Sequence, residues 1–113
     1  MTEFIYLYRG GERATSPDEG QKQMQLWMTW MKELGEKGHL KAVGSPLEQS
    51  GKLVSGKQKV VSDGPFAEAK DLIAGYSLVT AKDIDEAVAL SKGCPIFLTN
   101  GAVEVRPILQ MNM

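Results

Sequence analysis

Residues 3–9, Glu-Phe-Ile-Tyr-Leu-Tyr-Arg, stand directly before a glycine pair, Gly10-Gly11. β-Branched and aromatic residues are favoured in strands, and a pair of glycines interrupts regular structure. A run that is apolar at almost every position is typical of a strand in the middle of a sheet, with both faces covered. The stretch therefore predicts a buried central strand.

The next segment predicts a long helix over residues 17–36. Ser16 can cap this helix, Pro17 suits its first position, and Asp18-Glu19 favours the positive end of the helix dipole. The apolar side chains that recur at helical spacing are Met24, Leu26, Trp27, Met28, Trp30, Met31 and Leu34. They cover about 200° of the helix at 3.6 residues per turn, although an arc of about 100° suffices to cover one side of a sheet. The excess predicts a second contact surface, either a partner subunit or a pocket wall.

The rest of the chain predicts shorter elements. They are a strand at 39–47 broken at Gly44, a hairpin at 53–61, a strand at 72–80, a helix at 83–92 and a strand at 103–106. Asp83 with Glu86 three residues later forms a capping box at the start of the second helix.

The order of these elements is β-α-β, a hairpin insertion, then β-α-β, which is the split βαβ or ferredoxin-like pattern. It predicts an α+β fold, with four strands in an antiparallel sheet and both helices on one face. The other apolar face would then be uncovered, which predicts a homodimer formed through the sheet. The 113 residues have the size of a single domain, 1–113.

Composition argues against several classes of partner and cofactor. Thirteen lysine and arginine residues against 14 aspartate and glutamate residues leave a net charge of −1, which argues against nucleic-acid binding through phosphates. No apolar run approaches the roughly 20 residues that cross a membrane, and no secretory signal is visible. The single cysteine, Cys94, excludes an internal disulfide, so a cytoplasmic location is expected. One cysteine and one histidine argue against a metal site.

No cofactor is expected either. Gly51–Lys57 matches GxxxxGK, the body of a phosphate-binding loop, but Gln58 occupies the position of the required Ser or Thr. A strand is also predicted after the motif, where a phosphate-binding loop needs a helix. We therefore expect Gly51 and Gly56 to be turn residues of the hairpin.

Residues 61–70, Val-Ser-Asp-Gly-Pro-Phe-Ala-Glu-Ala-Lys, resemble the signature of the DGPF branch of the YCII-related proteins. Similar matches at Gly75-Tyr76, Asp83–Ala87 and Gly101–Pro107 extend the resemblance over nearly the whole chain. The resemblance implies a dimeric α+β barrel of ferredoxin-like subunits. It also implies an enzymatic role, suggested for relatives from an Asp-His pair in a cleft. A signalling role is the alternative, because some relatives occur beside extracytoplasmic-function sigma factors.

Asp63 and His39 are the candidate catalytic residues. Asp63 begins a predicted loop, where its carboxylate either bonds the amides of its own turn or acts as a general base. An apolar wall for such a base could come from Phe66 and from the helix that carries Trp27. His39 follows Gly38 at a helix–strand junction, and it is the only side chain whose unperturbed pKa lies near neutrality. It either caps the helix C-terminus or exchanges protons beside Asp63.

The candidate ligand-binding residues are Arg106, Glu104, Phe66, Tyr76 and Trp27. Glu104 and Arg106 share one face of the last strand, which predicts either a surface ion pair or an arginine anchor for an anionic ligand. Tyr76 packs in the core or an interface, or presents its hydroxyl group to a cleft. Trp27 packs in the core or, with the adaptable methionines around it, lines a pocket for an apolar ligand.

These residues leave two functions open. The first is a cofactor-independent enzyme that uses Asp63, with or without His39, to move a proton on a small organic substrate. The second is a non-catalytic ligand-binding or regulatory module in which the DGPF loop is architectural. An Asp63 carboxylate in a closed apolar pocket favours the enzyme. A carboxylate held by backbone amides, or a His39 far from Asp63, favours the module.

Overall fold

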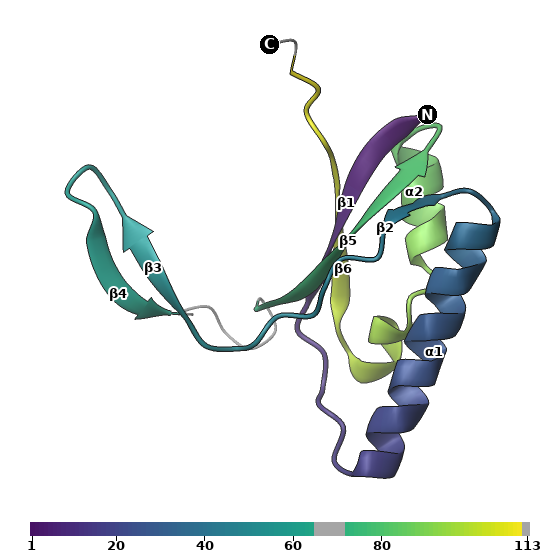
Figure 1. Cartoon of the computed structure of the whole chain (residues 1–113), viewed down its shortest axis with the longest axis horizontal. Coiled ribbons are helices and arrows are strands. Elements are labelled where there is room, and N and C mark those ends of the chain that lie inside the picture. Colours follow the sequence, from purple (N-terminus) through teal and green to yellow (C-terminus); the bar gives the residue numbers. More distant parts are fainter. Residues whose placement is uncertain (65–71, 112–113) are drawn as a thin grey trace.

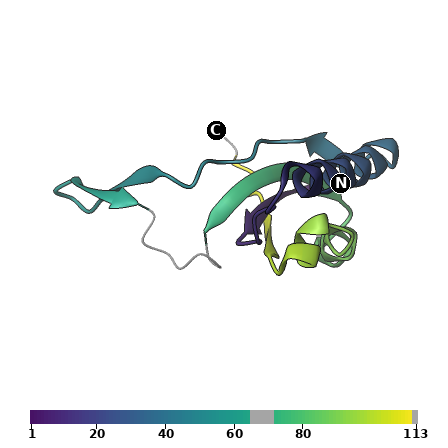
Figure 2. The same cartoon turned by 90° about the horizontal axis from the view of Figure 1, so that it is seen from below.

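The computed structural model describes residues 1–64 and 72–111 and has the predicted α+β architecture. The main antiparallel sheet has the order β2-β5-β1-β6 and consists of β1 (Thr2–Arg9), β2 (Leu40–Ala42), β5 (Ile73–Ala81) and β6 (Ala102–Pro107). The helices α1 (Pro17–Glu36) and α2 (Ile84–Ser91) lie on the same side of this sheet (Figure 1). A second, two-stranded sheet of β3 (Gly51–Ser55) and β4 (Val60–Gly64) projects from the main body (Figures 1 and 2).

Helix α1 begins and ends where the sequence predicts. The Ser16 side chain accepts a hydrogen bond from the Glu19 backbone N–H at 3.2 Å and so caps the N-terminus. At the other end, Gly38 takes the left-handed conformation with φ +79°, and the His39 N–H donates to the Leu34 carbonyl at 2.8 Å. This reversal satisfies a carbonyl that the helix leaves unpaired and sends the chain into β2.

Helix α2 has the predicted capping residues, but the Glu86 side chain bonds the backbone N–H of Lys82 instead of that of Asp83. The Asp83 carboxylate accepts from the Glu86 N–H at 2.8 Å, while Glu86 reaches back to the Lys82 N–H at 3.0 Å. A short 3-10 helix, η2 (Pro95–Thr99), follows and was not predicted, because five residues are too few to show a helical period.

The core lies between the sheet and the two helices. Phe4, Tyr6 and Tyr8 of β1 are buried on the helix side, whereas Ile5 and Leu7 point to the opposite face and are only half-buried. The expectation that this strand is covered on both faces is therefore wrong for the described chain. The strand is central, as predicted, but both helices pack on the same face of the sheet.

Aromatic side chains join the sheet to both helices. The Tyr6 and Trp30 rings stack with centroids 6.0 Å apart, and the Tyr6 hydroxyl donates to the Ala87 carbonyl of α2 at 2.5 Å. Burial raises the pKa of Tyr6 to about 12, so the phenol remains protonated and keeps this donor at neutral pH.

The predicted strand at 39–47 is regular only over Leu40–Ala42. Gly44 has φ +73° and passes so close to β5 that a Cβ atom there would lie 1.8 Å from the Tyr76 carbonyl oxygen. The chain then rejoins the sheet edge through an isolated antiparallel bridge between Pro46 and Gly75. The interruption predicted at Gly44 is confirmed, and it turns residues 43–47 into an irregular segment along the β5 edge.

The hairpin gives the chain an open shape. Its four large apolar side chains, Leu53, Val54, Val60 and Val61, are all at least half exposed, at 50–62%. The radius of gyration is 15.7 Å, whereas a compact domain of this length has about 13 Å. The smallest dimension is 18 Å, which fits a single sheet with one layer of helices. The open sheet face and the hairpin together leave much apolar surface to water in a single subunit.

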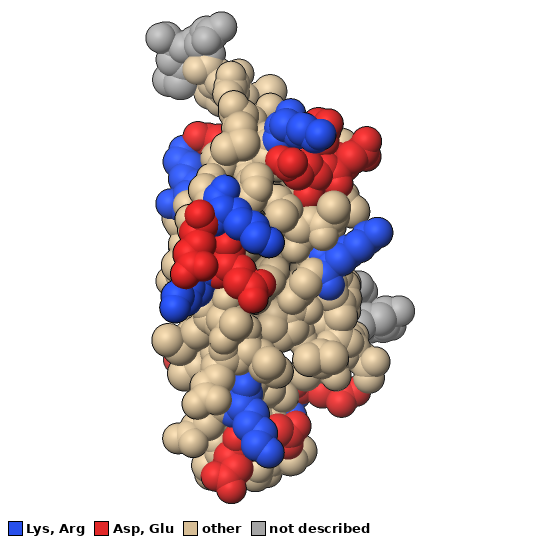
Figure 3. Space-filling view, turned by 90° about the vertical axis from the view of Figure 1, so that its right-hand side faces the viewer, with Lys and Arg blue, Asp and Glu red and all other residues tan. Residues whose placement is uncertain are grey.

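The surface over the helices carries charges of both signs. Figure 3 shows lysine and arginine side chains interleaved with aspartate and glutamate there, rather than gathered into one basic patch. Across residues 1–64 and 72–111, no helix combines the length and apolar character needed to traverse a bilayer.

Candidate functional site

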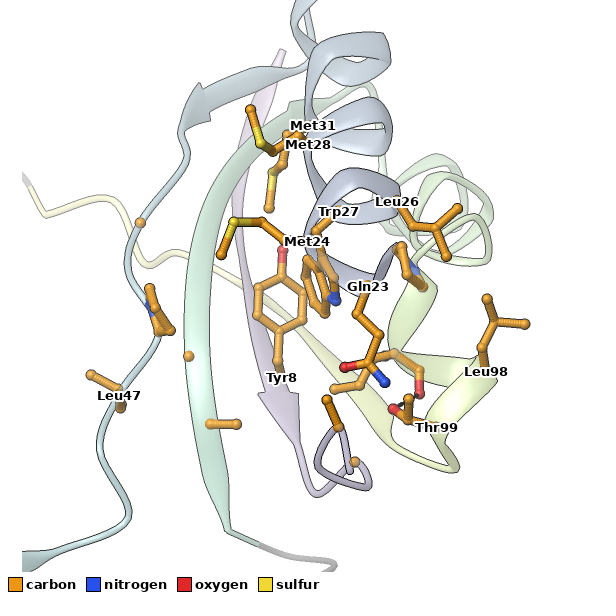
Figure 4. A pocket seen from close by; sticks show the side chains of 18 of the residues that line it. Tyr8, Gln23, Met24, Leu26, Trp27, Met28, Met31, Leu47, Leu98 and Thr99 are labelled. Atoms are coloured by element: carbon orange, nitrogen blue, oxygen red, sulfur yellow. Dashed lines mark hydrogen bonds between the residues drawn. The ribbon is translucent and has the colours of Figure 1, made fainter. Parts of the chain in front are cut away.

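An open groove of about 1340 Å³ borders α1. We call its part between α1 and residues 43–47 the methionine cleft, because three methionines line it (Figure 4). The cleft is formed by Tyr8, Met24, Trp27, Met28, Met31, Val43 and Leu47. On the other side of α1, Leu26 faces Leu98 of η2 (Figure 4).

The walls of the methionine cleft are apolar and exposed. Met24 is 64% exposed, Met28 65% and Val43 56%, whereas Trp27 and Met31 are half-buried against the core. The exposed methionines belong to the excess apolar arc of this helix. They are the side chains that a second surface or a bound molecule would cover.

The floor of the cleft is aromatic. The Tyr8 and Trp27 rings meet edge to face, with centroids 4.7 Å apart and planes at 84°. The Tyr8 hydroxyl donates to Ser77 Oγ at 2.8 Å, and Ser77 Oγ donates to the Val43 carbonyl at 2.5 Å. Burial is the largest influence on Tyr8 and raises its pKa, so the floor is neutral at physiological pH.

The structure places Asp63 on the projecting hairpin, far from this cleft. Asp63 does not begin a loop as predicted but lies inside β4, because the hairpin register pairs it with Lys52 and continues to Gly51–Gly64. Its side chain is 85% exposed and forms an ion pair with the Lys52 ammonium group. Among residues 1–64 and 72–111, therefore, nothing encloses Asp63 in an apolar pocket, and Asp63 is a strand residue rather than the first residue of a loop.

His39 binds the sheet rather than the end of α1. Its Nδ1 lies 2.8 Å from the Thr80 carbonyl of β5, and only the backbone N–H of His39 bonds the helix. The expected cap by the imidazole is therefore wrong. A carbonyl can only accept, so we assign a proton to Nδ1, and in the neutral ring Nε2 is then the acceptor. His39 immediately precedes β2, whereas Asp63 lies in the hairpin, and the single chain does not bring them together (Figures 1 and 2).

Glu104 and Arg106 form the predicted ion pair only at long range. Arg106 Nε lies 3.9 Å from one Glu104 oxygen, while the other Glu104 oxygen pairs closely with Arg9 of β1. All three charged groups lie on the face of the sheet that the helices leave uncovered. The strand register opposes Glu104 to Leu7, which lies on that face. Sequence reasoning missed Arg9, because cross-strand partners depend on the register.

The other predicted ligand-binding residues have different locations. Trp27 lines the methionine cleft, and Tyr76 contributes to the wider groove. The register opposes Tyr76 to Leu7, so its side chain belongs to the uncovered face. Phe66 lies outside the described residues.

Tyr8 and Ser77 are the site residues that the sequence reasoning missed. The alternation along β1 places Tyr8 on the same face as Phe4 and Tyr6, but it does not show which face the helices cover. Ser77 is completely buried within an apolar strand. A serine between apolar neighbours is the signal for an internal hydrogen bond, because a buried hydroxyl group needs a partner.

Neither the cysteine nor a carboxylate cluster forms a reactive centre in the described part of the chain. Cys94 is buried, and burial raises the pKa of its thiol to about 12, which disfavours the thiolate. Among residues 1–64 and 72–111, no group of three or more His, Cys, Asp or Glu side chains could hold a metal ion.

Comparisons with known proteins place the chain in a family. A solved structure of similar fold is 5-chloro-2-hydroxyhydroquinone dehydrochlorinase (TftG) from Burkholderia phenoliruptrix AC1100, in complex with 2,5-dihydroxybenzoquinone. The match has a TM-score of 0.54 and 16% identity and covers 96% of this chain and 95% of the other, so it shows likeness of fold.

A sequence relative is "Uncharacterized protein R00369" of Rhizobium meliloti (strain 1021). It is 38% identical over 58 residues, which are 48% of this chain and 44% of that protein. The chain therefore matches less than half the length of this relative. The model of the YCII-related domain matches much more, residues 2–112. Because this match takes in both helices and every strand described above, the chain belongs to the YCII-related family.

Proposed function

We propose that the protein binds small, apolar ring compounds in the methionine cleft. The main support is that three methionines and Val43 form open apolar walls above an aromatic floor of Tyr8 and Trp27. Ligand sites are concave and mostly apolar with few polar groups, and methionine adapts to ligands of different shape. The fold likeness to a protein solved with a quinone is a second, weaker support.

A charge placed in the cleft wall tests this proposal. Met24→Glu should weaken binding of toluene at least about tenfold, because a carboxylate must lose water when an apolar ligand covers it. Glutamate and methionine have similar helix propensities, so α1 should persist. The dissociation constant is measured by ligand-observed NMR on the folded protein. Leu109→Glu is the matched control, because Leu109 is 80% exposed and does not line the groove. Equal toluene affinity in the two variants would contradict the proposal.

We further propose that the working form is a homodimer. The half-buried Ile5 and Leu7 on the uncovered sheet face, and the exposed apolar side chains of the hairpin, support it. Sedimentation equilibrium at micromolar concentration should give about twice the chain mass of 12.4 kDa. A mass that stays at one chain would refute this assembly.

An enzyme that moves a proton with Asp63 is the second candidate function. It is supported by the fold likeness to a dehydrochlorinase and by the contact of His39 Nδ1 with the Thr80 carbonyl, which leaves Nε2 of the neutral ring to accept a proton. Catalysis of this kind works best where water is excluded. Because the Asp63 side chain is 85% exposed, a second subunit or the substrate would have to cover it. The separation of His39 from Asp63 in the single chain favours the binding function.

Asp63→Asn separates the two candidates. The variant should lose less than about 1 kcal/mol of unfolding free energy, because an exposed ion pair contributes little. Under the binding function its toluene affinity stays at the wild-type value. Under the enzymatic function, deuterium exchange from D2O into hydroxyquinone or ketone probes should fall by about 10² or more. Wild-type exchange rates in the folded Asn variant would exclude the base role.

Two finer assignments rest on the sequence. The stretch that begins at Asp63-Gly64 supports membership in the DGPF branch. Because some relatives occur beside sigma factors, the ligand-binding function could serve regulation. The single buried cysteine supports a reducing, cytoplasmic location.

A further inference from the structure

The floor of the methionine cleft contains a short chain of hydrogen bonds. Tyr8 Oη, Ser77 Oγ and the Val43 carbonyl oxygen follow one another at 2.8 and 2.5 Å. Ser77 has no exposed surface, so water does not reach its hydroxyl group, whereas Tyr8 keeps 5% exposure and lines the groove. The Ser77 hydroxyl therefore depends on its protein neighbours for hydrogen bonding.

The hydrogen bonds from Tyr8 through Ser77 to Val43 can be donated in only one direction. A carbonyl oxygen can only accept, so the 2.5 Å contact with Val43 requires the proton of the Ser77 hydroxyl group. The sulfur of Met31, 3.9 Å from Ser77 Oγ, is also only an acceptor. Since Ser77 has no second proton, it must accept from Tyr8. The single phenolic proton of Tyr8 is therefore already donated inside the protein.

Tyr8 Oη can thus offer a ligand only an acceptor lone pair. Figure 4 shows the hydroxyl end of Tyr8 directed toward Met24 and Trp27, into the methionine cleft. Gln23, the polar side chain labelled beside them, extends toward Thr99 instead (Figure 4). The cleft therefore combines apolar walls with an acceptor at its floor.

We propose that the methionine cleft selects planar ring compounds that carry an O–H or N–H donor, such as phenols, and that this donor binds Tyr8 Oη. The proposal rests on the proposed function, because it assigns a ligand class to the same cleft. A ring with a methyl group or a carbonyl at that position leaves the acceptor unpaired or meets it with a second acceptor. Such mismatches reduce affinity once the bound ring covers Tyr8 Oη from water.

Matched probes in two variants test the proposal. Toluene and phenol have nearly the same shape, and phenol is neutral at pH 7. Tyr8→Phe keeps the ring and removes the acceptor. We expect the phenol-to-toluene affinity ratio to fall about tenfold in this variant. Comparing the phenol-to-toluene ratio between the two proteins cancels the different hydration of the two probes.

Ser77→Ala tests the direction of the hydrogen bonds. Without Ser77, the Tyr8 proton becomes available to the ligand, and benzaldehyde, which carries only an acceptor, should gain about tenfold in affinity. Thermal melting checks that both variants are folded. If one variant unfolds, the other is sufficient to test the proposal.

The outcomes are distinct for the two proposals. A phenol-to-toluene ratio unchanged by Tyr8→Phe, or a benzaldehyde affinity unchanged by Ser77→Ala, would overturn the donor selectivity while toluene binding still supports the cleft. Failure of toluene and phenol alike to bind the wild-type protein would overturn the proposed function as well.

Discussion

Trp30→Ala should lower the free energy of unfolding by about 3–5 kcal/mol, the usual cost of removing a buried large aromatic side chain. Trp30 is 6% exposed, and its ring packs against Tyr6, Tyr8 and Trp27. Its removal therefore leaves a cavity between β1 and α1, where aromatic contacts join the sheet to the helix. Urea unfolding at fixed protein concentration measures the loss.

Met28→Ala is the matched control for this prediction. Met28 is also a large apolar residue of α1, but it is 65% exposed, so its truncation should cost less than about 1 kcal/mol. Similar losses in both variants would show that α1 is held by its exposed methionines as much as by its buried tryptophan. That result would contradict the assignment of Trp30, and not Met28, to the hydrophobic core.

Gly44→Ala should cost at least about 3 kcal/mol, because the new methyl group meets rigid backbone. The added Cβ would lie 1.8 Å from the Tyr76 carbonyl oxygen and 2.7 Å from its carbon, so residues 43–47 must move away from β5. That movement would also strain the bridge from Pro46 to Gly75 and the bond from Ser77 to Val43. A urea midpoint far below that of the wild type is the expected measurement.

Gly56→Ala separates the steric contact from the backbone conformation. Gly56 has φ +76°, close to the +73° of Gly44, but no heavy atom lies within 4 Å of its added Cβ. Alanine there should cost only the conformational penalty of about 1–2 kcal/mol. Equal costs at the two glycines would mean that the close approach to β5 contributes nothing.

The fold was predictable because its signals are local and repeated. The Ser16-Pro17 start of α1, its regular apolar period and the Asp83 cap each depend on residues a few positions apart. The four-stranded antiparallel sheet with both helices on one face followed from the order of elements. The uncovered face could not be assigned, because Phe4, Tyr6 and Tyr8 on one side and Ile5 and Leu7 on the other are equally apolar.

The candidate site was much harder to predict, since it depends on long-range register. Trp27 was identified from the excess width of the apolar arc on α1. The partner of Glu104 is Arg9, and the partner of Tyr8 is Ser77, each separated by more than 60 positions in the chain. Asp63 was placed in a loop because Asp-Gly-Pro is a strong turn signal, although pairing with Lys52 extends the strand through it. Local turn preference was overridden by cross-strand pairing.

The position of β1 between β5 and β6 affects how the protein can fold during synthesis. β1 leaves the ribosome well before its two neighbours, which begin at Ile73 and Ala102. Its aromatic side chains therefore have no strand to pair with until most of the chain has been made, and closing such long loops is slow. A nascent chain that stops within the hairpin should thus lack the sheet altogether and depend on chaperones to shield Phe4, Tyr6 and Tyr8.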